Sequence, residues 1–287
     1  MFQCVRLNKK NFDIFKKLNT SNSSFNSLNK DFFEAYDKCN FASQMFLKRK
    51  VKLLKKQDDY IGYIWFEMED KNNCNINSLN VPKIHSHLPY KFLIDILKHN
   101  CTISYLCENN NYNFEVLQNI GFHKKDGTLI LLHCIEEHIP LIQKEGLEFQ
   151  IFRLGVDEKL RCDLQNKIFK DDSRIPLTLD DIYIDEMQDY YVQNGSIFLK
   201  RNEEYIGYGQ IILEDDMPVI VNFGILEEYR GYGYSKVLLR YLFNIIKCNN
   251  FTKVKLKVKS SNEIALNLYK SLGFKILGQI YKWQLKK

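Results

Sequence analysis

The sequence has little of what marks a secreted or membrane-spanning protein. No apolar run reaches the roughly 20 residues that a membrane-spanning helix needs. The chain begins MFQCVR, without the apolar stretch of a signal peptide. Its eight cysteines are scattered and form no Cys-x-x-Cys pair, which argues against both a disulfide framework and a zinc site. We therefore expect a cytoplasmic protein with reduced thiols, no bound metal and no membrane partner.

Histidine is missing from the second half of the chain. The six histidines are His85, His87, His99, His123, His133 and His138. The first two have the spacing of a metal-ligand pair, but such a pair in a loop beside prolines is more often plain surface. Any proton transfer in the second half would therefore need a base of another type.

Strong charge of one sign is absent as well. The formal net charge is +6, with 26% charged and 45% hydrophobic residues, which is ample material for globular cores. The only dense basic stretch, residues 48–56, is typical of a solvated hairpin face. We expect no nucleic-acid partner.

The most informative stretch present is residues 221–235, VNFGILEEYRGYGYS. A strand pattern ends near Leu226, two glycines follow, and an amphipathic helix pattern begins around Tyr234. Gly231 and Gly233 let the backbone come close to a ligand, and the free N–H groups of a helix N-terminus attract an anion. Arg230 adds a cation, so the stretch predicts a pyrophosphate site. Neither Gly-x-Gly-x-x-Gly nor a Gly-Lys-Ser/Thr loop is present, which excludes Rossmann and Walker loops.

The pattern downstream is regular. An apolar helical stripe runs over residues 237–246, an alternating strand over 252–259, and Ser260 with Glu263 predicts a capping box for another helix. That helix passes through Tyr269 and ends at Gly273, before a strand from Phe274. Strand, helix and strand in this order predict a right-handed crossover.

Together these features resemble the GNAT superfamily of acyl-CoA-dependent N-acyltransferases. The acetyl-CoA loop of that family is similar in spacing to Arg230, Gly233 and Ser235, and the family also has an Asn near the start of the later helix, a Tyr seven residues on, and Gly-Phe at its end. The resemblance implies an α+β fold whose mixed, mostly antiparallel sheet is flanked by helices. It also implies acetyl-CoA as acyl donor and no metal.

The resemblance carries roles to individual residues. Tyr269 would lie beside the CoA sulfur and protonate the leaving thiolate, although it could also be a core aromatic. Asn262 would hydrogen-bond the pantetheine or pyrophosphate region, or could only cap its helix. A bulge at Gly224 would open the sheet, and a backbone N–H near Ile225 or Leu226 would stabilise the developing oxyanion. The residues expected to contact acetyl-CoA are Gly224, Ile225, Leu226, Arg230, Gly231, Tyr232, Gly233, Tyr234, Ser235 and Asn262.

The general base is not assigned by these patterns. Glu227, Glu228 and Asn222 are the nearest polar side chains, but the two glutamates belong to an expected exposed turn.

The first half repeats this plan in altered form. FQCVRL at 2–7 matches FQIFRL at 149–154, YIGY at 60–63 recurs at 205–208, and Gly-Phe at 121–122 recurs at 273–274. Nearly constant offsets predict two tandem GNAT-like domains, residues 1–143 and 146–287. The segment 81–89 has no glycine or arginine, and Leu117 stands where the second half has Tyr269. We expect the first domain to have lost acetyl-CoA binding.

Within the second half we expect helices over residues 157–170 and 180–192. Strands are expected over 196–201, 205–214 and 218–226.

The expected function is therefore an N-acetyltransferase. It would move an acetyl group from acetyl-CoA to a primary amine of a small molecule or peptide by direct attack in a ternary complex, with the first domain walling the acceptor site. Two alternatives remain: an aminoacyl- or other acyl-transferring tandem GNAT enzyme, and a non-catalytic CoA-binding regulatory protein.

Overall fold

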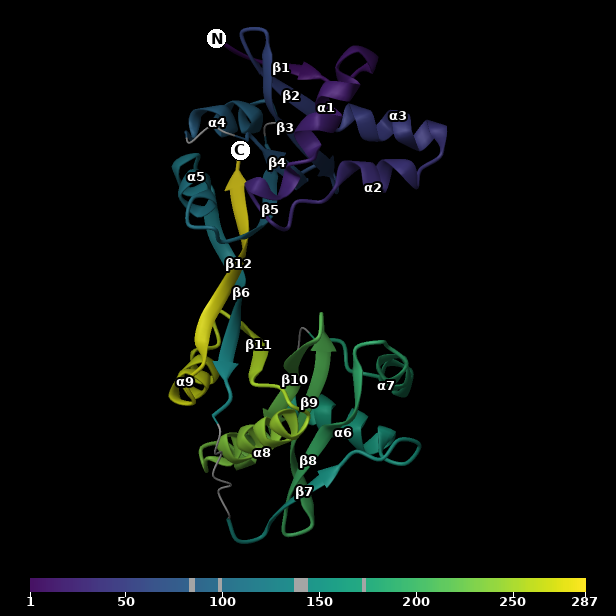
Figure 1. The fold of residues 1–287 in the computed structure, drawn as a ribbon, viewed down its shortest axis with the longest axis vertical. Helices are drawn as coiled ribbons and strands as arrows, with labels where there is room; N and C mark the ends of the chain where they lie inside the picture. Colours follow the sequence, from purple (N-terminus) through teal and green to yellow (C-terminus); the bar gives the residue numbers. More distant parts are fainter. Residues whose placement is uncertain (83–85, 98–99, 137–143, 172–173) are drawn as a thin grey trace. The chain divides into compact units, whose positions relative to one another are not determined.

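The structure, a computed structural model, describes residues 1–82, 86–97, 100–136, 144–171 and 174–287 (Figure 1). These residues form two compact units. Unit 1 comprises Met1–Thr128, Lys259–Ser261 and Gly278–Lys287, and unit 2 comprises Leu129–Val258 and Asn262–Leu277. Over the described ranges, no helix is long and apolar enough to cross a membrane.

Unit 1 is a mixed sheet with helices. Its strands run in the order β1-β2-β3-β4-β5-β12, antiparallel except for the parallel pair β4 and β5. The elements are β1 (Phe2–Arg6), a 3₁₀ turn (Lys9–Asn11), α1 (Phe12–Asn19), a second 3₁₀ turn (Asn22–Ser24), α2 (Phe32–Asp37), α3 (Phe41–Arg49), β2 (Val51–Lys56), β3 (Asp59–Met68), β4 (Asn73–Asn80), α4 (Leu88–Asp95), β5 (Thr102–Glu108), α5 (Asn113–Asn119) and the end of β12 (Lys275–Lys286).

Unit 2 has the same plan. Its strand order is β7-β8-β9-β10-β11-β6, antiparallel from β7 to β10 and parallel between β10 and β11. This confirms the predicted α+β fold class. The elements are the end of β6 (His123–Cys134), β7 (Leu147–Ile151), α6 (Glu158–Ile168), α7 (Leu179–Glu186), β8 (Tyr191–Arg201), β9 (Glu204–Glu214), β10 (Met217–Ile225), a 3₁₀ turn (Glu227–Tyr229), α8 (Tyr234–Cys248), β11 (Lys253–Lys259) and α9 (Glu263–Ser271).

In unit 2, helices cover both faces of the sheet (Figure 1). A Cβ built on Gly209 would lie 2.8 Å from Leu242 of α8, while the guanidinium of Arg161 in α6 lies over the ring of Tyr208. Successive residues of β9 point to opposite faces, so α8 and α6 lie on opposite sides of it. The apolar stripe of α8, with Leu238 and Leu242 fully buried, is the reason it packs there.

The last strand of each sequence half completes the sheet of the other unit. Residues 129–134 of β6 belong to unit 2 beside β11, where Ile135 N–H donates to the carbonyl of Thr252. Residues 278–286 of β12 belong to unit 1, where Trp283 lies opposite Tyr105 of β5 and is 2% exposed. The compact units therefore differ from a division of the chain at residues 143–146. The sequence repeats give the order of the elements in each half. They do not show which strand the last strand of each half pairs with.

The expected helix over residues 180–192 is wrong in its second half. Helix α7 ends at Glu186, and β8 begins at Tyr191, which pairs with Ile212 of β9. An irregularity in register follows Tyr191, and Asn194 has φ 63°. The run of Tyr190, Tyr191 and Val192 suits a strand better than a helix, and the partner strand decides the matter.

Candidate functional site

The sheet of unit 2 opens between β10 and β11. These strands pair only at Val219 and Ile220, and β10 changes register against β9 between Val221 and Gly224. The change is a bulge, and Asn222 within it has φ 49°. A Cβ at Gly224 would lie 2.3 Å from Cγ2 of Ile168, so glycine lets the end of α6 pack onto the bulge.

A cavity of about 460 Å³ lies at this opening. It is bounded by β10, the end of α6, the glycine loop and α9. Its lining residues are Ile168, Phe169, Phe223, Gly224, Ile225, Arg230, Gly231, Gly233, Ser235, Lys236, Asn262, Ile264, Ala265, Leu268 and Tyr269.

The glycine loop has the backbone that the sequence predicts. Gly231 has φ 84° and Gly233, the residue before the first turn of α8, has φ 81°, a region that side chains strongly disfavour. The first N–H groups of a helix have no partners inside the helix, and its N-terminus carries partial positive charge. The end of the cavity at the loop therefore fits a phosphate or pyrophosphate.

Arg230 is a cation on the cavity, and its hydrogen bonds also connect α6 to β10. Its Nε donates to the carbonyl of Ile225 at 3.1 Å, and its Nη2 donates to the carbonyl of Ile168 at 3.1 Å. The side chain thus holds the end of α6 to the end of β10, beside the bulge.

Tyr269 is both buried and on the cavity. It is 8% exposed, and its ring centroid lies 5.6 Å from Phe274 and 6.4 Å from Phe223. Burial raises its pKa to about 12. The phenol stays protonated at neutral pH, so it can donate a hydrogen bond or a proton to a group in the cavity.

Asn262 caps α9. Its Oδ1 accepts from the N–H of Ala265 at 3.1 Å. The predicted capping box of Ser260 and Glu263 is therefore wrong, because the cap lies two residues after Ser260. With Oδ1 engaged, Nδ2 is the donor that Asn262 offers to a ligand.

Of the two backbone N–H groups predicted as oxyanion donors, those of Ile225 and Leu226, one is engaged within the sheet. Leu226 N–H donates to the carbonyl of Ile206 at 2.8 Å, so it is engaged within the sheet. Ladder hydrogen bonds alternate sides along an antiparallel strand, so the N–H of Ile225, opposite Gly207, points to the open side of β10.

Most of the residues predicted to act on or contact acetyl-CoA line the cavity, and three of them do not. Those on it are Gly224, Ile225, Arg230, Gly231, Gly233, Ser235, Asn262 and Tyr269, whereas Leu226, Tyr232 and Tyr234 are not among its lining residues. Sequence reasoning missed Ile168 and Phe169 of α6, because nothing local shows where a helix end packs. It also missed Lys144, whose Nζ donates to the carbonyl of Tyr232, and Lys236 of α8. Lys236 directly follows the glycine loop in the sequence, which was the available signal for it, whereas nothing local points to Lys144.

Unit 1 has the same opening, but its own chain fills it. β4 and β5 pair only over residues 73–76 and 102–105. Beyond that point Asn29 donates to the carbonyl of Leu79 at 3.0 Å and accepts from Tyr105 Oη at 2.7 Å. Asn26 donates to the carbonyl of Leu106 at 2.8 Å. Asn29 thus bridges the two strands, and Asn26 fixes the same segment to β5, where unit 2 has its cavity.

Unit 2 contains histidine although the second half of the sequence does not, because it includes residues of the first half. The strand exchange brings His133 into this unit, where its ring stacks on Phe243 at 4.7 Å, and burial lowers its pKa. It lines a separate cavity with Arg240 and Gly273. His85, His99 and His138 lie outside the described residues. In the part of the chain that is described, no three His, Cys, Asp or Glu side chains are grouped to hold a metal ion.

Part of the chain is similar in sequence to known proteins. The model of the acetyltransferase (GNAT) family matches residues 163–274. An N-alpha-acetyltransferase of Sulfurisphaera tokodaii is 42% identical over 57 residues, covering 20% of this chain and 34% of the relative. The chain spans about half to two thirds of the length of two other curated relatives.

Two solved structures show the same fold over the whole chain. A GCN5-related N-acetyltransferase from Sphaerobacter thermophilus superposes with a TM-score of 0.60 and 14% identity, covering 99% of this chain and 95% of that one. A tandem GNAT protein from the clavulanic acid biosynthesis pathway gives 0.54 and 10% identity, covering 100% and 98%. Residues 163–274, with the glycine loop, Asn262 and Tyr269, thus form a GNAT acetyltransferase domain, and the chain as a whole has the fold of these GNAT structures.

Proposed function

We propose that unit 2 is an N-acetyltransferase that moves an acetyl group from acetyl-CoA to a primary amine. The observation that carries this is the single cavity that joins three features: a bulge with an outward N–H, a glycine loop at a helix N-terminus, and a protonated, buried tyrosine. The family match over residues 163–274 supports it.

The residues present fit the acyl donor. The loop of Gly231 and Gly233 with the start of α8 would hold the pyrophosphate, with Lys236 as a cation on the same cavity. The opening between β10 and β11 would admit the pantetheine arm, toward which Asn262 offers Nδ2. Acetyl-CoA supplies a thioester whose carbonyl is open to attack by an amine.

Three groups of the chain would then act on the reaction. Ile225 N–H stabilises charge on the carbonyl oxygen. Tyr269 donates its proton to the departing sulfur. The bulge at Gly224 leaves room for the amine to approach the carbonyl directly, so the protein forms no covalent link to the acetyl group.

The acceptor is an amine whose identity the cavity does not specify. The relative from Sulfurisphaera tokodaii is named as an N-alpha-acetyltransferase, which supports including α-amines of peptides among the acceptors to be tested. Unit 1, where Asn29 bridges the corresponding strands, would have lost CoA binding and would act as a structural partner or as a wall for the acceptor.

Mass spectrometry of an amine panel tests the proposal. The full chain is incubated with acetyl-CoA and polyamines, amino sugars, lysine-containing peptides and peptides with free α-amines, and parallel reactions contain propionyl-CoA, succinyl-CoA or an aminoacyl-tRNA. We expect a mass gain of one acetyl group, about 42 Da, on an amine of one class. Tight CoA binding without transfer to any acceptor would contradict the enzyme and favour the regulatory alternative.

A further inference from the structure

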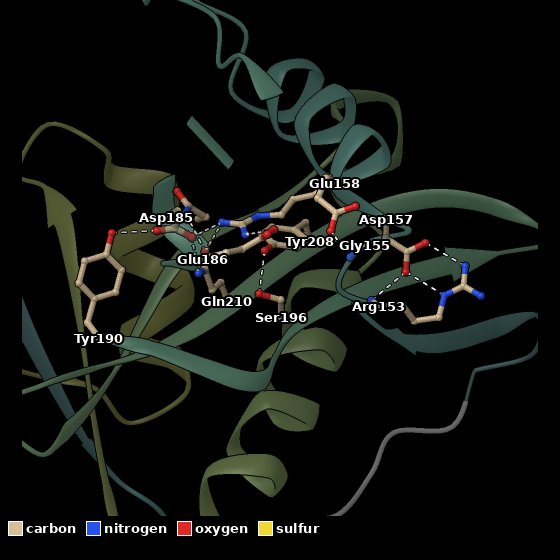
Figure 2. Close-up of polar contacts among 12 residues, drawn as sticks. Arg153, Gly155, Asp157, Glu158, Asp185, Glu186, Tyr190, Ser196, Tyr208 and Gln210 are labelled. Atoms are coloured by element: carbon tan, nitrogen blue, oxygen red, sulfur yellow. Dashed lines mark hydrogen bonds and ion pairs between the residues drawn. The ribbon is translucent and has the colours of Figure 1, made fainter. Parts of the chain in front are cut away.

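A layer of buried polar side chains lies between α6, α7 and the sheet of unit 2. Arg161 of α6 is 1% exposed, and its Nη2 donates to Asp185 of α7 and to Oε1 of Gln210, the latter at 3.0 Å. Gln210 Nε2 donates to Asp185 Oδ2 at 2.9 Å, and Figure 2 shows Asp185, Glu186 and Gln210 together. Gln210 Oε1 also accepts from Asn222 Nδ2 at 2.9 Å. Hydrogen bonds therefore connect α7 to the bulge of β10.

Several polar atoms of this layer are buried without a hydrogen-bond partner among the described residues. They are Nε and Nη1 of Arg161, both amide atoms of Gln165, and Oε1 of Glu186. More than nine in ten buried polar groups in folded proteins have a partner, often an ordered water. Gln165 is 1% exposed and lies one turn before Ile168, which lines the cavity. Because ordered water usually satisfies such groups, we expect water in this layer, near the end of α6 that lines the cavity.

The two neighbouring carboxylates of α7 differ in their surroundings. Burial acts to raise the pKa of Asp185, but hydrogen bonds from Arg161 and Gln210 outweigh it and lower that pKa. The Glu186 side chain is 8% exposed, and its Oε1 lies 3.7 Å from Arg161 Nη1 without a hydrogen bond. Burial raises the pKa of Glu186, Glu158 adds to the rise, and Arg161 opposes it. Neighbouring carboxyl groups with pKa values pushed apart divide acid–base roles between them.

We propose that Glu186 takes up the proton that the acceptor ammonium must lose, through water held in this layer by Arg161 and Gln165. One N–H bond of the ammonium breaks and one O–H bond forms on Glu186, leaving a neutral amine that can attack the thioester. Asp185 stays ionised and holds Arg161 and Gln210, so it is a positioning residue. This inference rests on the proposed function.

Four charged or titratable groups surround Glu186. Glu158 and Arg161 face it from α6, Asp185 from its own helix, and Tyr191 from β8. The two neighbouring carboxylates disfavour its ionised form and Arg161 favours it, while the Tyr191 phenol is uncharged at neutral pH because burial raises its pKa. A raised pKa makes Glu186 a stronger base than an exposed carboxylate, which suits general base catalysis.

Kinetics of Glu186→Gln test the assignment, with Asp189→Asn as the control. Asp189 is exposed just after α7, so its substitution removes the same charge from a surface position. Using acetyl-CoA and the amine that the panel identifies, we expect Glu186→Gln to lower kcat/KM about 10²-fold to 10⁴-fold and to remove the acidic limb of its pH profile. Affinity for CoA should stay unchanged, and the control should match the wild type.

Thermal melts give a second readout that needs no acceptor. A carboxyl whose folded pKa is raised costs no stability below its unfolded pKa; the cost grows as pH rises from the unfolded to the folded pKa and is complete above it. Glu186→Gln should therefore raise the Tm at pH 8 and leave it equal to the wild type near pH 4. A lower Tm of the Glu186→Gln protein at pH 8 would show that Glu186 is a structural ion-pair partner of Arg161. That result would overturn the proposal.

The two proposals fail in different ways. Wild-type protein that acetylates no amine overturns the proposed function, and this inference with it. Wild-type turnover that Glu186→Gln retains, acidic limb included, overturns the role of Glu186 alone.

Discussion

At the scale of single residues, burial determines the protonation state of Tyr269. A phenol on the surface has a pKa near 10, and the raised value of about 12 keeps the proton on Tyr269 over the whole neutral range. The cost is that of burying a polar group, and it is tolerable because the ring packs on Phe274. The same side chain is thus a core aromatic and a candidate proton donor.

Tyr269→Phe separates these two contributions. The ring still packs, so CoA affinity and Tm should stay near wild type, while the missing proton should lower kcat and kcat/KM together by about 10²-fold. Titration calorimetry, thermal melts and steady-state kinetics measure the three quantities. Tyr183→Phe, on exposed α7, is the matched control and should change none of them. Wild-type turnover in a stable Tyr269→Phe protein would remove the phenol from the mechanism.

At the scale of elements, the glycine loop and α8 form the part of the site that the sequence predicts best. Positive φ at Gly231 and Gly233 is a local property of a tight loop, and the start of α8 follows from its apolar stripe. Neither depends on which strand lies beside which.

Gly233→Ala tests whether this loop holds an anion. A side chain at φ 81° is strained, so some stability is lost wherever such a change is made. Gly155 has φ 79°, with nothing within 4 Å of an added Cβ, and it is not among the lining residues of the cavity. Gly155→Ala should therefore cost similar stability and leave CoA affinity unchanged, while Gly233→Ala should weaken affinity at least tenfold in calorimetry. Equal affinities in the two variants would mean that the loop is an ordinary turn.

Features that depend on contacts between residues far apart in the sequence could not be predicted from the sequence. The expected capping box at Ser260 competes with a cap at Asn262, and only the path of the chain out of β11 decides between them. Similarly, the strand of Tyr191 exists because β9 lies beside it, and Ile168 reaches the cavity because Gly224 lets α6 approach. Local patterns thus predicted the loop, and the family resemblance implied the fold class and the place of Tyr269, whereas the polar layer of Arg161 and Glu186 needed tertiary structure.

At the scale of the whole molecule, the two units differ in what fills the opening of the sheet. In unit 1, Asn29 bridges β4 and β5, Asn26 bonds to β5, and both side chains are buried. We therefore expect titration calorimetry of the full chain with CoA to give a stoichiometry near one. A value near two would contradict the interpretation of unit 1 as a unit that has lost CoA binding.

The exchange of end strands has a consequence for how the chain can be divided. A fragment of residues 146–287 contains the whole glycine loop, Asn262 and Tyr269, but it lacks the part of β6 that completes the sheet of unit 2 beside β11. Without it, β11 becomes an exposed edge. We expect this fragment to show no cooperative melt and no CoA binding, whereas the full chain shows both. A fragment 146–287 that binds CoA as tightly as the full chain would show that the contiguous half folds alone.

A point substitution tests the same exchange without cutting the chain. Leu131 of β6 belongs to the first sequence half, yet it is fully buried within unit 2. Leu131→Ala should lower the free energy of unfolding by about 2–5 kcal/mol, the usual range for a buried leucine. Because the lost contacts lie in unit 2, hydrogen exchange should increase most in β10 and β11 and much less in β2 and β3. Leu53→Ala, equally buried but in β2 of unit 1, is the matched control and should give the reverse pattern. Increased exchange confined to β2 and β3 in the Leu131→Ala protein would place that leucine in unit 1 and contradict the exchange.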